Sequence, residues 1–395
     1  MAGAGMGLKQ DLYLSRRPLA GFVAIGVAWA TYFAQMPVIK AHVGASDGAY
    51  GMAILLASSG AVVAMWLAPL FQRAFSRVAV PLGIAILALG MLMSGISTTL
   101  MLLVVGIALA SIGSGIVDVL INARVSEIEA RQGRSLMNLN HALYSFAYAG
   151  AALATGALRE ARIATGAVFL LLFAVLLILA HAARDRVAEA EETALPDLPG
   201  QIPHGVVLLV GLVVLTAFLA EAASEGWSAL HLERTLGGTA GEGALGPAAL
   251  GLTMGIGRLF GHGLSRFIRD TRLMLLATLL SAAGIGLAGL APSVPVALLG
   301  FAIGGLGISV VAPLALGLLG RLVPPDMRLA AISRASVLGY GAFFFGPPLM
   351  GLVAEGFGLR AAFVVVAGIL CLTALAVLPA LARRSMTQTI VSPAA

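Results

Sequence analysis

Charged residues are scarce in this sequence: Asp, Glu, Lys and Arg make up 11% of the 395 residues, whereas 59% are hydrophobic. The mean hydropathy is +1.00. A water-soluble chain of this length cannot bury so much apolar surface in one or two cores. The composition therefore excludes an ordinary soluble protein. It predicts an all-α polytopic membrane protein.

Cysteine is almost absent, since Cys371 is the only one, and no disulfide can form within the chain. The sequence also lacks a nucleotide-binding loop, an H-E-x-x-H motif, a C-x-x-C motif and a recognisable Ser/His/Asp arrangement. We therefore expect no enzyme activity, no cofactor and no metal site. The net charge of +6 comes without a basic stretch interleaved with aromatic residues, so a nucleic-acid partner is not expected either.

Apolar runs of span length follow one another along the chain, and about 20 residues suffice to cross the hydrocarbon core as a helix. The run after residues 1–17 has full span length, which favours an uncleaved first helix over a signal peptide. Breaks at charges and Gly/Pro clusters predict twelve transmembrane helices, at residues 18–39, 49–71, 79–97, 100–122, 137–158, 163–182, 205–227, 246–265, 273–291, 294–319, 329–354 and 360–381.

One long polar connection, at residues 183–204, divides these helices six and six. Its acids and prolines are typical of an extended linker. The halves also repeat, because GIALASIGSG from Gly106 and GFAIGGLGIS from Gly300 share glycines. We expect two pseudo-symmetric six-helix bundles, 1–182 and 205–395, joined by a cytoplasmic linker. In such repeats the substrate site lies near the midplane between the halves.

The distribution of Lys and Arg predicts the orientation, because positive residues collect on the cytoplasmic side. We expect a multi-pass protein of the inner (cytoplasmic) membrane with both termini in the cytoplasm. Arg258 then belongs with the inner helix ends. The outside receives only Lys40, Arg159, Arg162, Arg234 and Arg360.

Twelve predicted helices in two repeats resemble the major facilitator superfamily over nearly the whole chain. Residues 118–145, DVLINARVSEIEARQGRSLMNLNHALYS, resemble the D-V-x-x-N … E-x-x-x-G-R-x-x-M-x-x-x-H signature of MosC-like permeases, distant relatives of fucose permease. EGWSALHL, GRLFGHGLSRF and GYGAFFFGPPLMG are similar to the same branch. The resemblance implies a secondary active transporter that works by alternating access.

The loop motif of the superfamily, G-x-L-x-D-R, is kept only in part. Gln72 and Ser265 stand at its acidic position, so the contact by which that acid stabilises the outward-open state is not expected. The fifth predicted helix also lacks the G-P motif of many drug/proton antiporters, which weighs against that class. The remnants of the loop motif are Leu70, Arg73 and Arg77 in the first half, and Gly261 and Arg266 in the second.

Two acids, Glu221 and Glu225, fall in the outer half of the seventh predicted helix. Residues four apart share a helix face. Two close carboxylates in a low dielectric resist ionising together, so one of them can bind and release a proton. An ionisable residue in a span is a functional candidate by default. Both are candidates for proton coupling, as is Asp118. The alternative for Glu225 is a place at the outer interface beside Trp227.

A second polar cluster is predicted at the inner helix ends. Asp118 and Asn122 lie in the fourth helix, His141 in the fifth and Arg334 in the eleventh. A contact between Asp118 and Arg334 would join the halves and close the cytoplasmic side. The alternatives are that Asp118 pairs locally with Arg124 or His141, and that Arg334 extends its charge to the membrane surface.

Aromatic and amide side chains are the candidates for the cavity wall, and such a wall suits a sugar, a polyol or a related polar compound. The sequence therefore predicts a proton-coupled, monomeric carrier of a small solute. The alternatives are a multidrug/proton antiporter for amphipathic compounds and, less favoured, a sensor with a transporter fold. The predicted wall residues are Trp29, Tyr32, Gln35, Asn138, Asn140, Tyr144, Tyr340 and Phe344.

Overall fold

The computed structural model describes residues 2–134, 136–184, 204–264, 267–324 and 327–391, in which every regular element is a helix. The first bundle contains α1 (Ala2–His42), α2 (Asp47–Phe75), α3 (Ala79–Gly95), α4 (Leu100–Gln132), α5 (Met137–Glu160) and α6 (Thr165–Ala182). The second contains α7 (His204–Leu230), α8 (Ala240–Leu264), α9 (Asp270–Leu290), α10 (Val294–Leu322), α11 (Arg328–Leu372) and α12 (Leu378–Val391). Three short turns join neighbours: η1 (Ser76–Val78), η2 (His231–Thr235) and η4 (Thr373–Val377).

Eight helical segments of the described chain are long and apolar enough to cross a membrane. Many large apolar side chains on their outer faces are exposed, as expected of a surface that meets lipid. The prediction of an all-helical polytopic membrane protein is thus confirmed. Each remaining predicted span also falls on a helix, and the count of twelve stays a prediction.

Two helices run further than the predicted spans. The α1 helix begins at Ala2 and not near residue 18, and α4 continues to Gln132 and not to 122. Asp11 in the extra turns of α1 pairs with Arg134 just after α4, so the two extensions support each other. The α4 helix ends where Gly133 takes a left-handed conformation with φ 63°, which favours glycine. Hydropathy alone cannot show such polar helix ends.

The last two predicted spans meet at a kink inside α11. Gly358 has φ 83° and ψ 162°, a conformation open mainly to glycine, and it lies between the predicted spans 329–354 and 360–381. The second of these spans continues through η4 into α12. The sequence therefore placed this break correctly.

The internal repeat is visible in how the helices pack. A Cβ on Gly90 of α3 would meet the backbone of Gly106 in α4. A Cβ on Gly284 of α9 would meet the backbone of Gly300 in α10 in the same way. Small residues let helix backbones approach closely in membranes. The glycines shared by the two halves therefore serve one and the same contact, made once in each half.

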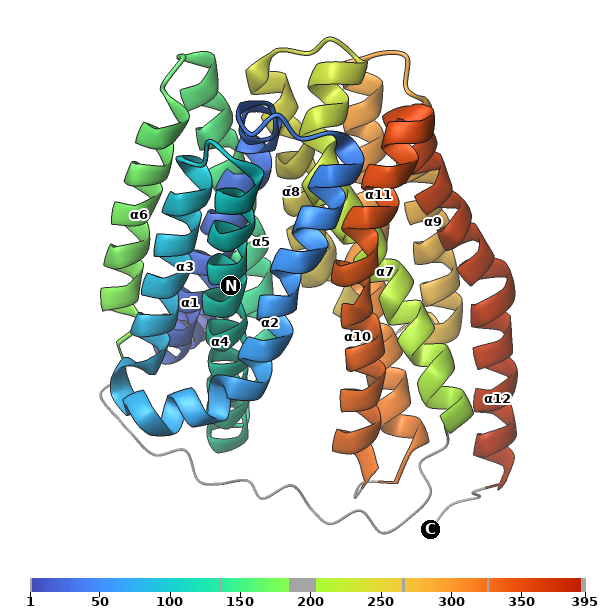
Figure 1. Cartoon of the computed structure of the whole chain (residues 1–395). Helices are drawn as coiled ribbons and strands as arrows, with labels where there is room; N and C mark the ends of the chain where they lie inside the picture. Colours follow the sequence, from blue (N-terminus) through green and yellow to red (C-terminus); the bar gives the residue numbers. More distant parts are fainter. Residues whose placement is uncertain (1, 135, 185–203, 265–266, 325–326, 392–395) are drawn as a thin grey trace.

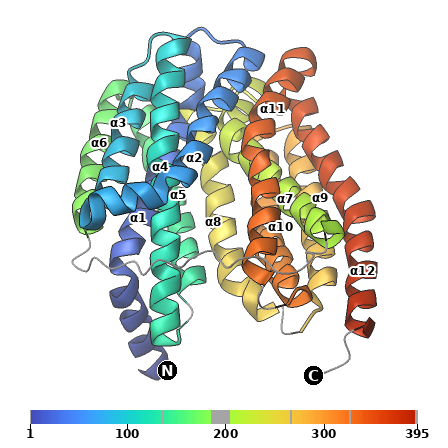
Figure 2. The same ribbon diagram turned by 60° about the horizontal axis from the view of Figure 1, so that its bottom comes forward.

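The two bundles approach each other unevenly along their length. We call the end at which α6 ends and α7 begins the linker end. Helix α2 packs against α11, and α5 packs against α8. These helices converge towards the end opposite the linker and diverge towards the linker end (Figure 1). The beginning of α1 and the end of α12 both lie at the linker end (Figure 2).

Candidate functional site

A cavity of about 320 Å³ lies between the two bundles, and both contribute to its wall. Helices α1, α2, α4 and α5 face α7, α8 and α11 across it. Nine of the sequence candidates line it: Trp29, Tyr32, Asp118, His141, Tyr144, Glu221, Glu225, Tyr340 and Phe344. The cavity thus lies between the halves, where the sequence predicts the solute site, and its role in binding stays a prediction.

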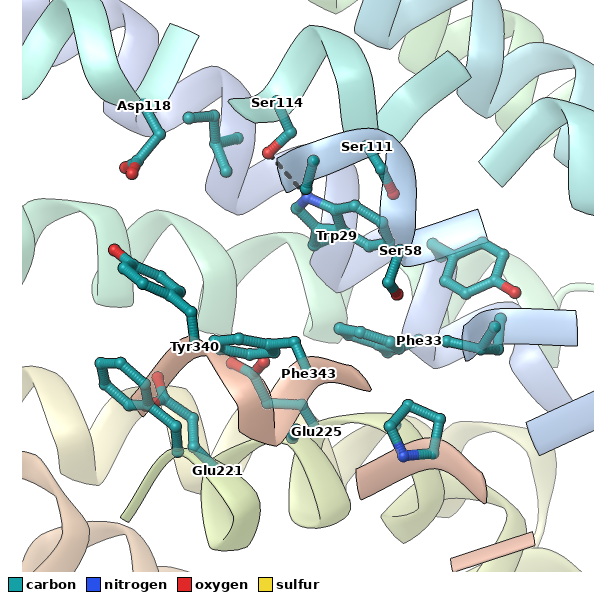
Figure 3. Close-up of a pocket in the computed structure, with 18 of the residues that line it drawn as sticks. Trp29, Phe33, Ser58, Ser111, Ser114, Asp118, Glu221, Glu225, Tyr340 and Phe343 are labelled. Atoms are coloured by element: carbon teal, nitrogen blue, oxygen red, sulfur yellow. Dashed lines mark hydrogen bonds between the residues drawn. The ribbon is translucent and has the colours of Figure 1, made fainter. Parts of the chain in front are cut away.

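The polar groups of the cavity lie on two facing walls. Asp118, Ser58, Ser111 and Ser114 come from the first bundle, and the acids of α7 lie opposite them (Figure 3). The indole Nε1 of Trp29 donates a hydrogen bond to Ser114 Oγ at 3.1 Å. Hydroxyl groups and ring faces therefore dominate the first wall.

Arg258 of α8 is a site residue that the sequence reasoning missed. Its guanidinium forms an ion pair with Glu221 Oε1 at 3.4 Å and donates a hydrogen bond to Ser145 Oγ at 2.6 Å. Both charged side chains are largely buried, at 17% and 13% exposed. The assignment of Arg258 to the inner helix ends was wrong, because the residue faces the cavity. Its place inside the predicted span 246–265 is the signal that would have found it.

Glu225 differs from Glu221 in having no polar partner among the described contacts. Its side chain lines the cavity, and the residue is only 9% exposed. The alternative position at the outer interface is wrong. Trp227 beside it is 2% exposed, lines the same cavity and packs edge-on against the Tyr50 ring, with centroids 5.7 Å apart. Glu225 is therefore a buried carboxyl group that faces open space.

The inner polar cluster is only partly assembled. Asn122 Nδ2 donates hydrogen bonds to Asp118, at 3.0 Å to Oδ1 and 2.8 Å to the carbonyl oxygen. His141 lines the cavity with its ring 4.9 Å from that of Phe22. Asp118 thus has an amide as its described partner, in place of the local pairings with Arg124 or His141 that the sequence allowed. Arg334 is exposed on α11, which agrees with the alternative that its charge extends to the surface.

The three predicted amides of the wall do not line the cavity. Gln35 is buried elsewhere, where its Oε1 accepts a hydrogen bond from Thr165 at 3.5 Å. Asn140 is buried and donates to the carbonyl oxygen of Leu136 at 2.9 Å, and Asn138 is exposed. Gln35 and Asn140 bond to interhelical and backbone partners, and the prediction that the three amides form the wall is corrected.

The loop-motif remnants are placed as expected for surface residues. Arg73 and Arg77 are exposed beside the turn between α2 and α3. Gly261 belongs to α8, and Arg266 lies outside the described residues.

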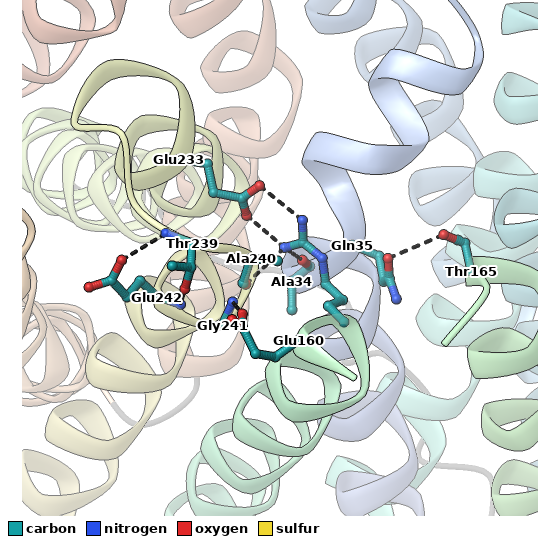
Figure 4. A network of polar contacts seen from close by, with 10 residues as sticks. Ala34, Gln35, Glu160, Thr165, Glu233, Thr239, Ala240, Gly241 and Glu242 are labelled. Carbon is teal, nitrogen blue, oxygen red and sulfur yellow. Dashed lines mark hydrogen bonds and ion pairs between the residues drawn. The ribbon is translucent and has the colours of Figure 1, made fainter. Parts of the chain in front are cut away.

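A bidentate ion pair joins the halves at the end opposite the linker. Arg159, at the end of α5, holds both oxygens of Glu233, with Nη1–Oε1 at 2.6 Å and Nη2–Oε2 at 2.9 Å (Figure 4). The Nη1 group also donates to the carbonyl oxygen of Ala34 at 2.7 Å. The Arg159 side chain is only 5% exposed. A guanidinium with this fork geometry fixes the relative position of the elements that it joins.

A second ion-pair group joins the same ends of the halves. Asp47, the first residue of α2, accepts hydrogen bonds from Arg234 at 2.9 and 2.5 Å and pairs with Lys40 at 2.8 Å. Burial alone would raise the pKa of Asp47, but the hydrogen bonds and charges of Arg234 and Lys40 hold it below its ordinary value. The carboxylate is therefore the stable form of this contact.

Ion pairs at the linker end have a different arrangement. The Arg134–Asp11 pair lies within the first half, and the Arg321–Asp270 pair lies within the second. The halves are thus clamped together at the end opposite the linker.

Comparisons with known proteins agree with this architecture. Residues 210–393 match the family model described as Major Facilitator Superfamily. An uncharacterised MFS-type transporter of Yersinia pestis is 27% identical, over 87% of this chain and 90% of the relative. Membrane protein MosC of Rhizobium meliloti is 26% identical, over 87% of this chain and 84% of MosC.

Solved structures show the same fold. A bacterial homologue of the human lysosomal transporter Spinster, described as inward-facing and occupied, superposes with a TM-score of 0.74 at 15% identity, over 95% of this chain and 97% of that one. A D-xylose–proton symporter gives a TM-score of 0.71 at 15% identity, over 92% and 96%.

Together with the two helical bundles around a central cavity, these matches support a secondary transporter. They support a transporter of the major facilitator superfamily, in a branch that includes MosC. This is a family of membrane transporters of small molecules and not a class of enzymes.

Proposed function

We propose that this protein is a proton-coupled carrier of a small solute and that Glu225 carries the proton. The observation that supports this is the contrast between two acids one helical turn apart. Glu221 has the guanidinium of Arg258 beside it, whereas Glu225 faces the cavity with no hydrogen-bond or ion-pair partner among the described residues. A buried carboxyl group without a partner is much less costly when neutral. The charge of Glu221 nearby disfavours a second carboxylate further.

The conformation fits one half of an alternating-access cycle. We place both termini and the linker in the cytoplasm of a cell and the chain in its inner membrane, as a monomer. The clamps of Arg159 and Asp47 then close the outer side, and the state is inward-facing. The likeness to a transporter solved in an inward-facing conformation supports this reading.

The cavity fits a small solute. Its volume of about 320 Å³ is at the lower end of the range of about 300–1,000 Å³ for ligand pockets. The hydroxyl groups of Ser58, Ser111 and Ser114 and the ring faces around them suit a sugar, a polyol or a related polar compound. The fold likeness to a D-xylose–proton symporter supports that class. The aromatic wall without the expected amides favours the second candidate, proton-driven export of amphipathic compounds.

We also propose that Asp118 and Arg334 meet when the linker end closes. In the state described here Arg334 is exposed and Asp118 is held by Asn122. Asp118→Asn and Arg334→Gln should each favour the inward-facing state, and the double variant should do no more than either single one. Accessibility of a cysteine at the linker end measures this, and additive effects would rule out a direct pair.

The proton on Glu225 can be tested without knowing the solute. Infrared spectra of the purified protein near neutral pH should show the carbonyl band of a protonated carboxyl group, and Glu225→Gln should remove it. Glu242→Gln is the matched control, because Glu242 is a half-buried acid in the first turn of α8, outside the cavity wall, that accepts a hydrogen bond from Thr239 N. If the band persists in Glu225→Gln, the proton is bound by another carboxyl group.

Coupling is then tested in vesicles with a solute from a thermal-shift screen of sugars, polyols, amino acids and cationic drugs. An imposed pH gradient should drive accumulation by the wild-type protein. Accumulation that is the same with and without the pH gradient would contradict the proposal.

A further inference from the structure

The acidic groups of the cavity outnumber its fixed cations. Asp118, Glu221 and Glu225 face it. Among the described residues that line the cavity, Arg258 supplies the one guanidinium. That guanidinium compensates Glu221. Asp118 is hydrogen-bonded by an amide, and the ring of His141 packs on an aromatic neighbour. Two carboxyl groups therefore remain to be balanced by whatever enters.

Glu225 offers a formed site for a positively charged group. It is more than nine-tenths buried, it faces the cavity, and its carboxyl group has no described partner. Leaving such a group ionised and unpaired is costly, and an opposite charge within hydrogen-bond distance removes that cost. The cavity thus gains most from an occupant that brings a positive charge to this carboxyl group.

Aromatic rings surround the same space. Trp29 and Phe33 stack on one side with centroids 5.7 Å apart, and Phe343 and Tyr340 lie beside Glu225 on the other (Figure 3). Ring faces attract cations, and they attract weakly hydrated organic cations in particular. A carboxyl group among ring faces is the chemistry that recognises an ammonium group.

An inorganic cation fits less well. Within the described residues there is no group of three or more His, Cys, Asp or Glu side chains that could hold a metal ion. Hard cations take about six oxygen ligands, and the rings beside Glu225 supply none. The wall therefore selects an organic cation.

We propose that the transported solute carries a positively charged nitrogen, an amine protonated at neutral pH or a quaternary ammonium, which binds Glu225 in exchange for its proton. This inference rests on the proposed function, because it uses the carboxyl group to which that proposal assigns the proton. One proton leaves as one positive charge enters, so the cavity keeps the same net charge with either occupant. Competition for one carboxylate makes the exchange an antiport. The rest of the solute can be a hydroxylated ring or an aromatic ring, since the two walls suit both.

The test compares each cation with a neutral molecule of nearly the same shape. We would measure the melting temperature of the purified full-length protein at pH 7.5 with 2-phenylethylamine against 2-phenylethanol, and with glucosamine against glucose. A ligand that binds the folded state raises the melting temperature. At least one amine should raise it, and its neutral counterpart should not.

Variants assign the effect to the carboxyl group. Glu225→Gln should abolish the shift with the amine, Glu225→Asp should keep part of it, and Glu242→Gln should leave it unchanged. Binding to the wild-type protein in weakly buffered solution should release about one proton per amine bound, as the exchange requires. If Glu225→Gln does not fold, the weaker shift of Glu225→Asp and the proton release carry the test.

Three results would overturn the inference: neutral molecules that bind as well as their amines, amines that bind Glu225→Gln as well as wild type, or no shift with either amine. These results are distinct from failure of the proposed function. Equal binding of a neutral molecule, with the infrared band of Glu225 present, rejects the cation and leaves proton coupling standing. If amine binding depends on Glu225 but the infrared band of a protonated Glu225 is absent, the proposal that Glu225 carries a proton is rejected.

Discussion

Glu160, the last residue of α5, accepts a hydrogen bond from the backbone N–H of Gly241, the second residue of α8, at 2.8 Å. The same contact occurs once more between the halves. Glu355, near the kink of α11, accepts from the N–H of Gly48, the second residue of α2, and from the Ser46 hydroxyl. The first N–H groups of a helix lack partners within it, and a carboxylate there is favourable. Each half therefore caps a helix of the other with one glutamate.

These two caps predict that the outer closure weakens when either carboxylate is lost. Glu160→Gln and Glu355→Gln should each shift the equilibrium towards outward opening. A charge at a helix N-terminus contributes about 0.3–1 kcal/mol, so roughly a two- to fivefold shift is expected. The measurement is the labelling rate, by an impermeant thiol reagent, of Ser58→Cys in the cavity wall, in a Cys371→Ser background.

The control for this prediction is Glu242→Gln. Glu242 caps α8 from within the same half, through Thr239. Its loss should destabilise the helix end without changing the labelling rate. Equal acceleration in Glu242→Gln and Glu355→Gln would mean that the caps between the halves have no special part in closure.

The fold was predictable because lipid imposes a strong constraint. Every backbone polar group must be satisfied within the membrane, so long apolar runs must be helices. The break at Gly358 and the shared glycines at Gly106 and Gly300 followed from local sequence. The caps between the halves did not, because Glu160 and Glu355 read simply as polar residues at helix ends.

The site was predicted by depth along each helix but not by rotation about it. His141 and Tyr144, three residues apart on one face of α5, line the cavity, whereas the neighbouring Asn140 is buried away from it. Depth cannot separate Asn140 from His141, and which face meets the cavity depends on packing with other helices. Asn138 shares the face of His141 but lies one turn nearer the start of the helix, where it is exposed. Arg258 was missed for a related reason. Assigning each Lys and Arg to one side of the membrane places an arginine inside a span with those at the helix ends.

The close contact of α3 with α4 predicts a second outcome. A Cβ at Gly90 would meet the backbone of the neighbouring helix, and backbone cannot give way as a side chain can. Gly90→Ala should lower the melting temperature, and Gly284→Ala should do the same in the second half. Gly150→Ala is the matched control, since a Cβ there would meet nothing within 4 Å. A helical glycine in open space should tolerate alanine or gain from it. Equal melting temperatures for Gly90→Ala and Gly150→Ala would contradict the close packing.

The Arg258–Glu221 pair predicts a strongly non-additive pair of variants. Glu221→Gln leaves a guanidinium buried without its carboxylate, and Arg258→Gln leaves a carboxylate buried without its guanidinium. Removing one partner of a buried pair costs about 3–5 kcal/mol, whereas replacing both is far milder. The double variant should therefore melt at a higher temperature than Arg258→Gln alone. Additive losses in the double-mutant cycle would show that the two groups do not interact.

The Asp47 cluster predicts how the outer closure depends on pH. The pKa of Asp47 is lowered in the closed state, because Arg234 and Lys40 stabilise its carboxylate more than burial penalises it. Its contribution to closure is therefore fully present above the ordinary pKa of 3.8 and is lost as the pH falls through the lowered value. Between pH 5.5 and 7.5 that contribution should be constant. Asp47→Asn should accelerate outside labelling of Ser58→Cys by the same factor at both pH values. If Glu225 sets a pH dependence of closure in this range, Glu225→Gln should remove it while Asp47→Asn leaves it in place. A pH dependence that disappears with Asp47→Asn would instead locate the titrating group in the outer clamp.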